Sequence, residues 1–320
     1  MSVPVDSSPA ALRDLRDRVL AEVGRVVVGQ DEVAEGILAA LVVGGHALLE
    51  GVPGVAKSLL AQTVARTLAI DFARVQFTPD MLPSDITGTM MLRAGELSFR
   101  PGPIFTNVLL ADEINRTPPK TQAALLEAMQ EGQVSVEGES HALPEPFLVL
   151  ATQNPIDYEG TYPLPEAQLD RFVAKLEVGY PDEVHERAML SLGHRRLRPT
   201  GLDEVRAIAG PEDLQRARAE VDAVVVSDAV RDYVVALVRR TRDLPSVSLG
   251  ASPRAAVHLL ALARATAALA GRGFVIPEDA AAVAPVVLRH RIVMSPEAEL
   301  EQYTTDDAVR AALAEVPIPR

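Results

Sequence analysis

Short apolar runs alternate with stretches of helical periodicity over the first 180 residues of the chain. Five of the runs have the length and aliphatic content of strands that are buried on both faces of a parallel sheet. They lie at residues 47–49, 75–77, 108–111, 147–151 and 172–178. Helical periodicity separates most of them, most clearly over 58–68 and 121–131. The alternation predicts an α/β fold with a doubly wound parallel sheet of five strands.

Two segments, 90–99 and 134–143, interrupt this alternation, and each carries a glycine where a turn is expected. We expect both to be hairpin insertions. Beyond Tyr180-Pro181 the strand pattern nearly vanishes and helical periodicity takes over. We therefore expect an N-terminal helix over residues 1–22, an α/β domain over 23–179 and an all-helical domain over 180–320. Between the first two helices, residues 26–30 are expected to be a short extended segment, and Asp31 can cap the helix that follows.

Composition changes this picture mainly by exclusion. The chain has no cysteine and only six scattered histidines, which excludes disulfides and argues against a structural zinc. A net charge of −13 opposes attraction to a phosphate backbone, so nucleic acid is not an expected partner. No apolar run reaches the roughly 18 residues of a membrane span. The N-terminus also lacks the pattern of a secretion signal, and we expect a cytoplasmic protein without direct membrane insertion.

A glycine-bearing loop, Gly51-Val52-Pro53-Gly54-Val55-Ala56-Lys57-Ser58, joins the first predicted strand to a helix. A loop in this context turns backbone N–H groups and the start of a helix toward phosphate groups. Lys57 supplies a positive charge to the terminal phosphates, and the Ser58 hydroxyl can bind Mg²⁺. The sequence therefore predicts a site for ATP with Mg²⁺.

Ala56 is the one departure from the usual phosphate-loop pattern, which has glycine at this position. An alanine is compatible with the loop if residue 56 begins the helix with a negative φ. Gly54 would then be the residue that adopts unusual dihedral angles.

Polar side chains follow two further predicted strands at the point where each strand ends. Asp112 and Glu113 follow the apolar run 108–111, which resembles a Walker B motif. Asp112 is expected to hold Mg²⁺, and Glu113 is expected to polarise the attacking water. Asn154 follows the run 147–151 and is expected to orient that water. Because the carboxyl ends of parallel strands meet at one edge of a sheet, these groups are expected at the same site as the loop.

Several longer strings resemble those of the MoxR-type AAA+ ATPases, in the helix-2-insert group of that superfamily. Besides the two Walker stretches, they are Val28-Gly29-Gln30, the string from Phe77 to Gly88, Asp112-Glu113-Ile114-Asn115-Arg116 and the string from Tyr162 to Phe172. The resemblance covers nearly the whole chain. It implies that the helical domain is a lid, and it fits Ala56, since such proteins commonly carry alanine before the loop lysine.

The resemblance also implies specific roles for residues that are distant in the sequence. Asn154 corresponds to sensor 1, Arg254 to sensor 2, and Arg171 to an arginine finger that reaches the γ-phosphate held by a neighbouring subunit. The expected catalytic residues are Lys57, Glu113, Asn154, Arg171 and Arg254. The expected nucleotide-binding residues are Gly29, Gln30, Gly51, Pro53, Gly54, Val55, Ala56, Lys57, Ser58 and Leu59. The expected magnesium ligands are Ser58 and Asp112.

The function that these features imply is that of an oligomeric, hexameric ATPase that hydrolyses ATP to ADP and phosphate and remodels or activates a partner protein, as a chaperone does. The resemblance implies a protein client, or a partner with a von Willebrand factor A domain. Two alternatives stay open. One is the ATPase subunit of a metal chelatase, and the other is a nucleotide-gated oligomeric scaffold with negligible hydrolysis.

Overall fold

The computed structural model of the protein describes residues 10–93, 96–153, 162–192, 194–195, 198–199 and 201–319. The chain forms two compact units that are interleaved in sequence. The sheet unit comprises Asp17–Pro165 and Leu176–Leu214, and the helical unit comprises the residues up to Arg16, Glu166–Lys175 and Gln215–Arg320. The division passes through α1 (Ala10–Val23), β9 (Ala174–Glu177) and α8 (Pro211–Ala223). The domain boundaries expected from the sequence stay a prediction.

A five-stranded sheet in the order β2-β5-β8-β1-β9 forms the centre of the sheet unit. Its other strands are β1 (Ala47–Glu50), β2 (Phe72–Gln76), β5 (Val108–Asp112) and β8 (Leu148–Gln153). β1 pairs with β8, β8 with β5 and β5 with β2, in parallel each time. The predicted doubly wound sheet is thus confirmed.

Helices precede, connect and follow these strands in the chain. They are α2 (Asp31–Val42), α3 (Lys57–Thr67), α4 (Pro83–Thr87), η1 (Ile114–Arg116), α5 (Pro119–Glu131), α7 (Glu183–Met189) and η2 (Gly201–Glu204). Residues 24–26 form a turn and residues 27–30 contain bends and no strand, so the extended segment expected at 26–30 is wrong. Gln30 occupies the N-cap of α2, where its side chain makes no capping hydrogen bond, and Asp31 is the first residue of the helix, so Asp31 does not cap it.

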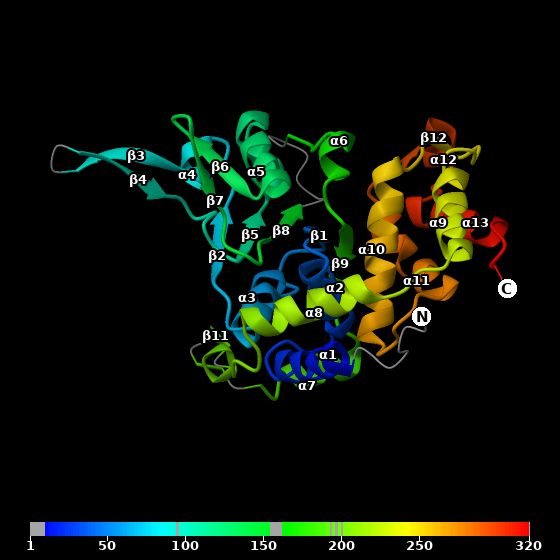
Figure 1. Ribbon diagram of the computed structural model, residues 1–320, viewed down its shortest axis with the longest axis horizontal. Helices are drawn as coiled ribbons and strands as arrows, with labels where there is room; N and C mark the ends of the chain where they lie inside the picture. The colour runs from blue at the N-terminus through cyan, green and yellow to red at the C-terminus, as the bar shows by residue number, and fades with distance from the viewer. Residues whose placement is uncertain are drawn as a thin grey trace, which may run out of the picture. The chain divides into compact units, whose positions relative to one another are not determined.

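Both hairpin insertions predicted from the sequence are present. β3 (Gly88–Arg93) pairs with β4 (Glu96–Pro101), and β6 (Gln133–Val136) pairs with β7 (Glu139–Ala142), antiparallel in both cases. Figure 1 shows the β3–β4 hairpin extending away from the sheet. The turn at Gly138 has a φ of 86°, a value that favours glycine. A short pair, β10 (His194–Arg195) with β11 (Arg198–Pro199), follows α7.

The helical unit is built mainly from its C-terminal helices. They are α9 (Asp228–Arg240), α10 (Pro253–Leu269), α11 (Pro277–Leu288), α12 (Pro296–Leu300) and α13 (Thr305–Glu315), with the short strands β12 (Val247–Leu249) and β13 (Val293–Met294). The short helix α6 (Glu166–Leu169) belongs to the same unit. Ser252 caps α10 through a hydrogen bond from the Ala255 N–H to its hydroxyl. Every helix in the part of the chain that the structure describes is too short or too polar to cross a membrane.

A buried histidine, His46, connects the start of β1 with β8 and α5. The Val149 N–H donates to Nδ1 at 3.0 Å, and Nε2 lies 3.0 Å from the Met129 carbonyl oxygen. A carbonyl can only accept and an N–H can only donate, so the ring is neutral, with its proton on Nε2. Burial lowers the pKa of His46 from 6.5 to about 4, because a charged ring there would lose its hydration.

This histidine makes the stability of the fold dependent on pH. Because its folded-state pKa lies below the unfolded value, the unfolded chain binds more protons between pH 6.5 and about 4, and stability falls as the pH drops through that range. We predict that His46 alone lowers the free energy of unfolding by about 2 kcal/mol between pH 7 and pH 5. Urea titrations of the wild type and His46→Gln at both pH values measure this. Equal losses in the two proteins would contradict it.

Candidate functional site

The phosphate loop lies between β1 and α3, as the sequence predicts. Gly51 lies so close to the chain after β9 that a side-chain carbon there would come within 2.3 Å of the Val178 carbonyl oxygen. Gly54 has a φ of 92°, and a carbon added there would meet nothing within 4 Å. Glycine is therefore required at position 51 by packing and favoured at position 54 by the backbone. The open space at Gly54 suits the approach of a phosphate group to the loop.

Ala56 departs from its expected conformation. Its φ is 64° and its ψ is 23°, in the left-handed region, and it is the N-cap of α3. The negative φ expected for residue 56 is therefore wrong. Gly54 and Ala56 both have positive φ, so the alanine occupies a position that glycine would occupy without steric cost.

Lys57 is the first residue of α3, and its ammonium group folds back onto the loop. Nζ donates to the Gly51 carbonyl and lies 3.5 Å from the Val52 carbonyl oxygen. Partial burial lowers the pKa of Lys57, while the negative charges of Asp112, Glu113 and, more weakly, Glu50 raise it. The carboxylates thus favour a charged ammonium where the terminal phosphates would lie.

Thr152, on β8, connects the two acidic residues at the end of β5. Its hydroxyl donates to Oδ1 of Asp112 at 2.6 Å and accepts from the Glu113 N–H at 2.8 Å. Thr152 is only 2% exposed, so the hydroxyl is held by packing. Glu113 has a φ of 58°, which is uncommon for a residue with a side chain and is found at functional sites. The Thr152 hydroxyl therefore fixes both the carboxylate of Asp112 and the backbone of Glu113.

Two polar residues of the edge strand β2 hold the same carboxylates from the other side. Arg74 donates to Oδ2 of Asp112 from Nε at 3.0 Å and from a terminal nitrogen at 2.6 Å. Gln76 donates to Glu113 at 2.8 Å, and Arg116 pairs with the same oxygen at 3.0 Å. Asp112 and Glu113 thus project from one sheet edge, each already oriented by hydrogen bonds.

The oxygen donors at this edge suit Mg²⁺. Ser58, the second residue of α3, brings a hydroxyl, and Asp112 brings a carboxylate; Mg²⁺ prefers such hard oxygens and keeps several waters. Among the described residues, no group of three or more histidine, cysteine, aspartate or glutamate side chains forms a metal cage. This fits a cation that takes its remaining ligands from phosphate groups and water.

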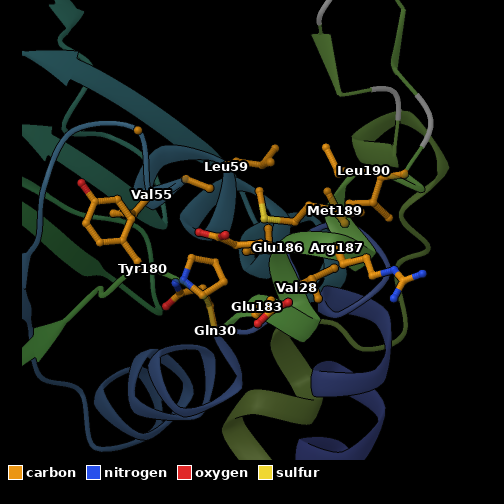
Figure 2. Close-up of a pocket in the computed structure, with 16 residues that line it drawn as sticks. Val28, Gln30, Val55, Leu59, Tyr180, Glu183, Glu186, Arg187, Met189 and Leu190 are labelled. Carbon is orange, nitrogen blue, oxygen red and sulfur yellow. The ribbon is translucent and has the colours of Figure 1, made fainter.

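A cavity of about 760 Å³ adjoins the phosphate loop within the sheet unit. Figure 2 shows Val55 and Tyr180 on one side of it and Met189 and Leu190 on the other. Its lining residues are Val26, Val27, Val28, Gln30, Gly54, Val55, Ala56, Leu59, Tyr180, Pro181, Glu183, Glu186, Arg187, Met189, Leu190 and Leu192. A mostly apolar cavity of this size beside a phosphate loop suits the flat, apolar base of a nucleotide.

The expected base-binding residues Gly29 and Gln30 have structural roles here. Gln30 lines the cavity and also donates from its side chain to the Gly179 carbonyl at 2.9 Å. Gly29 has a φ of 75°, and a side-chain carbon there would come within 2.9 Å of the His185 side chain. Both residues therefore hold the cavity wall where α7 packs against the turn before α2.

Three of the expected catalytic residues are not placed at this edge. Asn154 lies outside the described residues. Arg171 and Arg254 belong to the helical unit, where Arg254 pairs at 3.8 Å with Asp170, the residue that precedes Arg171. The roles of all three residues stay predictions.

Sequence reasoning missed Arg74, Gln76, Thr152 and the contribution of α7 to the cavity. Arg74 and Gln76 are exposed and flank the buried Val75, on a strand that the sequence identifies only at its apolar end. Their spacing of two residues was the available signal, because it places both on one face of the strand.

The chain is similar to known proteins both in sequence and in structure. The chain matches the ATPase family associated with various cellular activities (AAA) over residues 46–174 and the AAA lid domain over residues 239–312. It is 46% identical to the uncharacterized protein YeaC of Bacillus subtilis, covering 96% of each chain. It is 45% identical to the chaperone MoxR1 of Mycobacterium tuberculosis, covering 95% of this chain and 82% of that one. A crystal structure of a candidate ATPase from Cytophaga hutchinsonii is 41% identical, with a TM-score of 0.89, and the match covers 98% of this chain and 97% of that one.

The positive φ of residue 56 predicts an unusual effect of glycine. Ala56→Gly removes a steric cost of about 1 kcal/mol, which roughly offsets the greater freedom of glycine in the unfolded chain. We expect an unchanged or slightly higher melting temperature and unchanged ATP binding. Ala123→Gly, on the exposed face of α5, is the matched control and should cost about 1 kcal/mol. Equal destabilisation by the two substitutions would contradict the backbone conformation described here.

The Thr152 hydroxyl is expected to matter for hydrolysis as well as for stability. Thr152→Val keeps the shape of the side chain but leaves the Asp112 carboxylate and the Glu113 N–H without this partner. We expect a loss of about 1–3 kcal/mol in unfolding free energy and a fall in ATP hydrolysis on the order of tenfold or more. Thr152→Ser keeps the hydroxyl and should stay close to the wild type. Wild-type hydrolysis by the valine variant would show that this bond does not position the two acids.

Proposed function

Because this chain belongs to the MoxR family of AAA+ ATPases, we propose that it is an oligomeric machine that hydrolyses ATP with Mg²⁺ and remodels or activates a partner protein. One observation carries the proposal. The phosphate loop with Lys57 lies at the same carboxyl edge of the sheet as Asp112 and Glu113, which the Thr152 hydroxyl links, and an apolar cavity adjoins the loop.

Each group has a task that phosphoryl transfer requires. Lys57 and the N–H groups of the loop neutralise charge on the terminal phosphates, and Ser58 and Asp112 hold Mg²⁺. Glu113 accepts a hydrogen bond from the attacking water and aligns it with the γ-phosphorus. Asn154 orients the same water. When bound, Mg²⁺ would supply charge compensation to the phosphate groups.

The contacts of Glu113 support a gated site. Its carboxylate accepts hydrogen bonds from Gln76 and pairs with Arg116. A carboxylate that is satisfied by these donors is a poorer acceptor for water, so hydrolysis requires at least one of them to release it. Whether the Glu113 carboxylate is free to bind water therefore depends on the positions of Gln76 on β2 and Arg116 on η1.

Assembly of subunits completes the site in this proposal. Arg171 acts as the finger that neutralises transition-state charge at the neighbouring subunit's nucleotide, and Arg254 acts as sensor 2. We propose a hexameric ring, as the resemblance implies. Hydrolysis then depends on contact between subunits, since a single subunit lacks one of the required positive charges.

The exposed residues of the two hairpins favour a protein as the partner over nucleic acid. The β3–β4 hairpin exposes Leu92 and Leu97, which are 72% and 68% exposed and lie opposite each other on one face of the hairpin. The β6–β7 hairpin exposes Glu137 and Glu139, whose charge would repel a phosphate backbone. The relative named chaperone MoxR1 supports a protein client. We propose such a client, or a partner with a von Willebrand factor A domain, for a chain that acts in the cytoplasm.

Arg171 provides the test of this function. We predict Mg²⁺-dependent ATP hydrolysis whose rate per subunit rises with protein concentration, and a loss on the order of a hundredfold or more in Arg171→Ala. Arg231→Ala, which removes an exposed arginine paired with Asp228, is the control and should hydrolyse ATP normally. A phosphate-release assay across a dilution series, combined with light scattering, measures both quantities.

Two outcomes would contradict the proposal. A rate per subunit that is independent of both concentration and Arg171 would show that each site is complete within one chain. Assembly driven by ATP without phosphate release would favour the nucleotide-gated scaffold instead. The Glu113→Gln variant, which should hold ATP without cleaving it, is then the bait for capturing the client.

A further inference from the structure

A buried arginine, Arg291, lies just beyond the end of α11 in the helical unit. Its side chain is only 1% exposed, which is rare for arginine and requires compensating hydrogen bonds. Nε donates to Oδ1 of Asp170 at 2.8 Å. The guanidinium also donates to the Val287 carbonyl and, at 2.5 Å, to Nδ1 of His258.

The remaining bonds of Arg291 bracket Arg171. One terminal nitrogen donates to the carbonyl oxygen of Asp170 at 3.1 Å and to that of Phe172 at 2.5 Å. These are the residues immediately before and after Arg171, and they lie about 120 positions away from Arg291 in the sequence. Local turn bonds, from the Arg171 N–H to Gln168 at 3.2 Å and from the Phe172 N–H to Leu169 at 3.1 Å, complete the restraint.

Two neutral histidines reinforce the same segment. Burial, with a further contribution from Arg291, lowers the pKa of His258 to about 4, so its ring can accept the hydrogen bond from the guanidinium. His290 lies 3.0 Å from the Phe172 carbonyl oxygen through Nε2, and burial lowers its pKa as well. The carbonyl of Phe172 thus has two side-chain partners, and both come from the C-terminal part of the helical unit.

Asp170 extends this restraint to the start of α10. The Ser252 hydroxyl lies 3.0 Å from Oδ1 and 2.9 Å from Oδ2 of Asp170. Arg254 pairs with the same carboxylate at 3.8 Å. Segment 166–175 accordingly belongs to the helical unit. The backbone that carries Arg171 is therefore fixed to the helices of that unit.

We propose that Arg291 is a positioning residue for Arg171, whose backbone it fixes by binding the carbonyls on both sides, so that the helical unit delivers the finger to the neighbouring subunit. The inference rests on the proposed role of Arg171. Arg291 touches no substrate in this account and acts only through the segment that it holds. One terminal nitrogen reaches the Asp170 and Phe172 carbonyls and His258, while Nε binds the Asp170 carboxylate and the other terminal nitrogen binds the Val287 carbonyl. Lysine cannot replace Arg291 fully, because its single ammonium nitrogen cannot occupy these three positions together.

The test compares Arg291→Met and Arg291→Lys with Arg171→Ala. We expect hydrolysis to fall on the order of tenfold or more in Arg291→Met and less in Arg291→Lys, with binding of a fluorescent ATP analogue unchanged. Arg272→Met, which breaks a separate pair with the buried Asp279 in the same unit, is the control for lost stability. Its hydrolysis per folded subunit should stay at the wild-type level.

Subunit mixing separates positioning from a general structural role. Glu113→Gln subunits do not hydrolyse ATP but carry intact Arg171 and Arg291, so they can supply the finger to a neighbour. Added in excess, they should restore hydrolysis at the sites of both Arg291→Met and Arg171→Ala subunits. Rescue of Arg171→Ala but not of Arg291→Met would overturn the inference. Rescue of neither would instead contradict the shared site on which the inference rests.

Melting temperatures and light scattering keep the result interpretable if Arg291→Met folds poorly. In that case Arg291→Lys replaces Arg291→Met as the variant to be measured, because it retains the positive charge that neutralises Asp170. A lysine variant that folds, assembles and hydrolyses ATP at the wild-type rate would overturn the inference.

Discussion

The parallel register of β2, β5, β8 and β1 is the constraint on which the candidate site depends. Leu110 pairs with Leu150, and Leu150 with Ala47, so the three central strands end level with one another. On the other side Gln76 lies beside Asp112. Because side chains alternate between faces, a slip of one residue in any pair would turn Asp112, Thr152 or Arg74 away from the others. The apolar residues within the strands stabilise this register, and the register places the polar residues at the strand ends next to one another.

The sequence predicts most of this framework for a physical reason. Strands buried on both faces need unbroken apolar runs, and the polar residues that end them are therefore conspicuous. The backbone conformation of Ala56 cannot be predicted in the same way, because the sequence does not reveal the sign of its φ. Arg74 and Thr152 were missed because each looks like an ordinary strand residue until its neighbour across the sheet is known. Arg291 was missed because its partners are about 120 residues away in the sequence.

The two units contribute different parts of the proposed chemistry. The sheet unit holds the phosphate loop, the carboxylates and the cavity, so it can bind a nucleotide with its own residues. The helical unit holds Arg171 and Arg254, joined by Asp170 and fixed by the buried Arg291. In the proposed function, binding needs one unit of one chain, whereas hydrolysis also needs the arginines that the helical units supply.

Calorimetric titration with ATP, in the presence and absence of Mg²⁺, tests the central claim that the loop and the carboxylates form one nucleotide site. We expect one ATP per wild-type chain, no detectable binding to Lys57→Ala, and binding to Asp112→Asn that no longer strengthens when Mg²⁺ is added. Wild-type affinity in Lys57→Ala would contradict it, because the ammonium group beside the loop would then play no part in holding the phosphates.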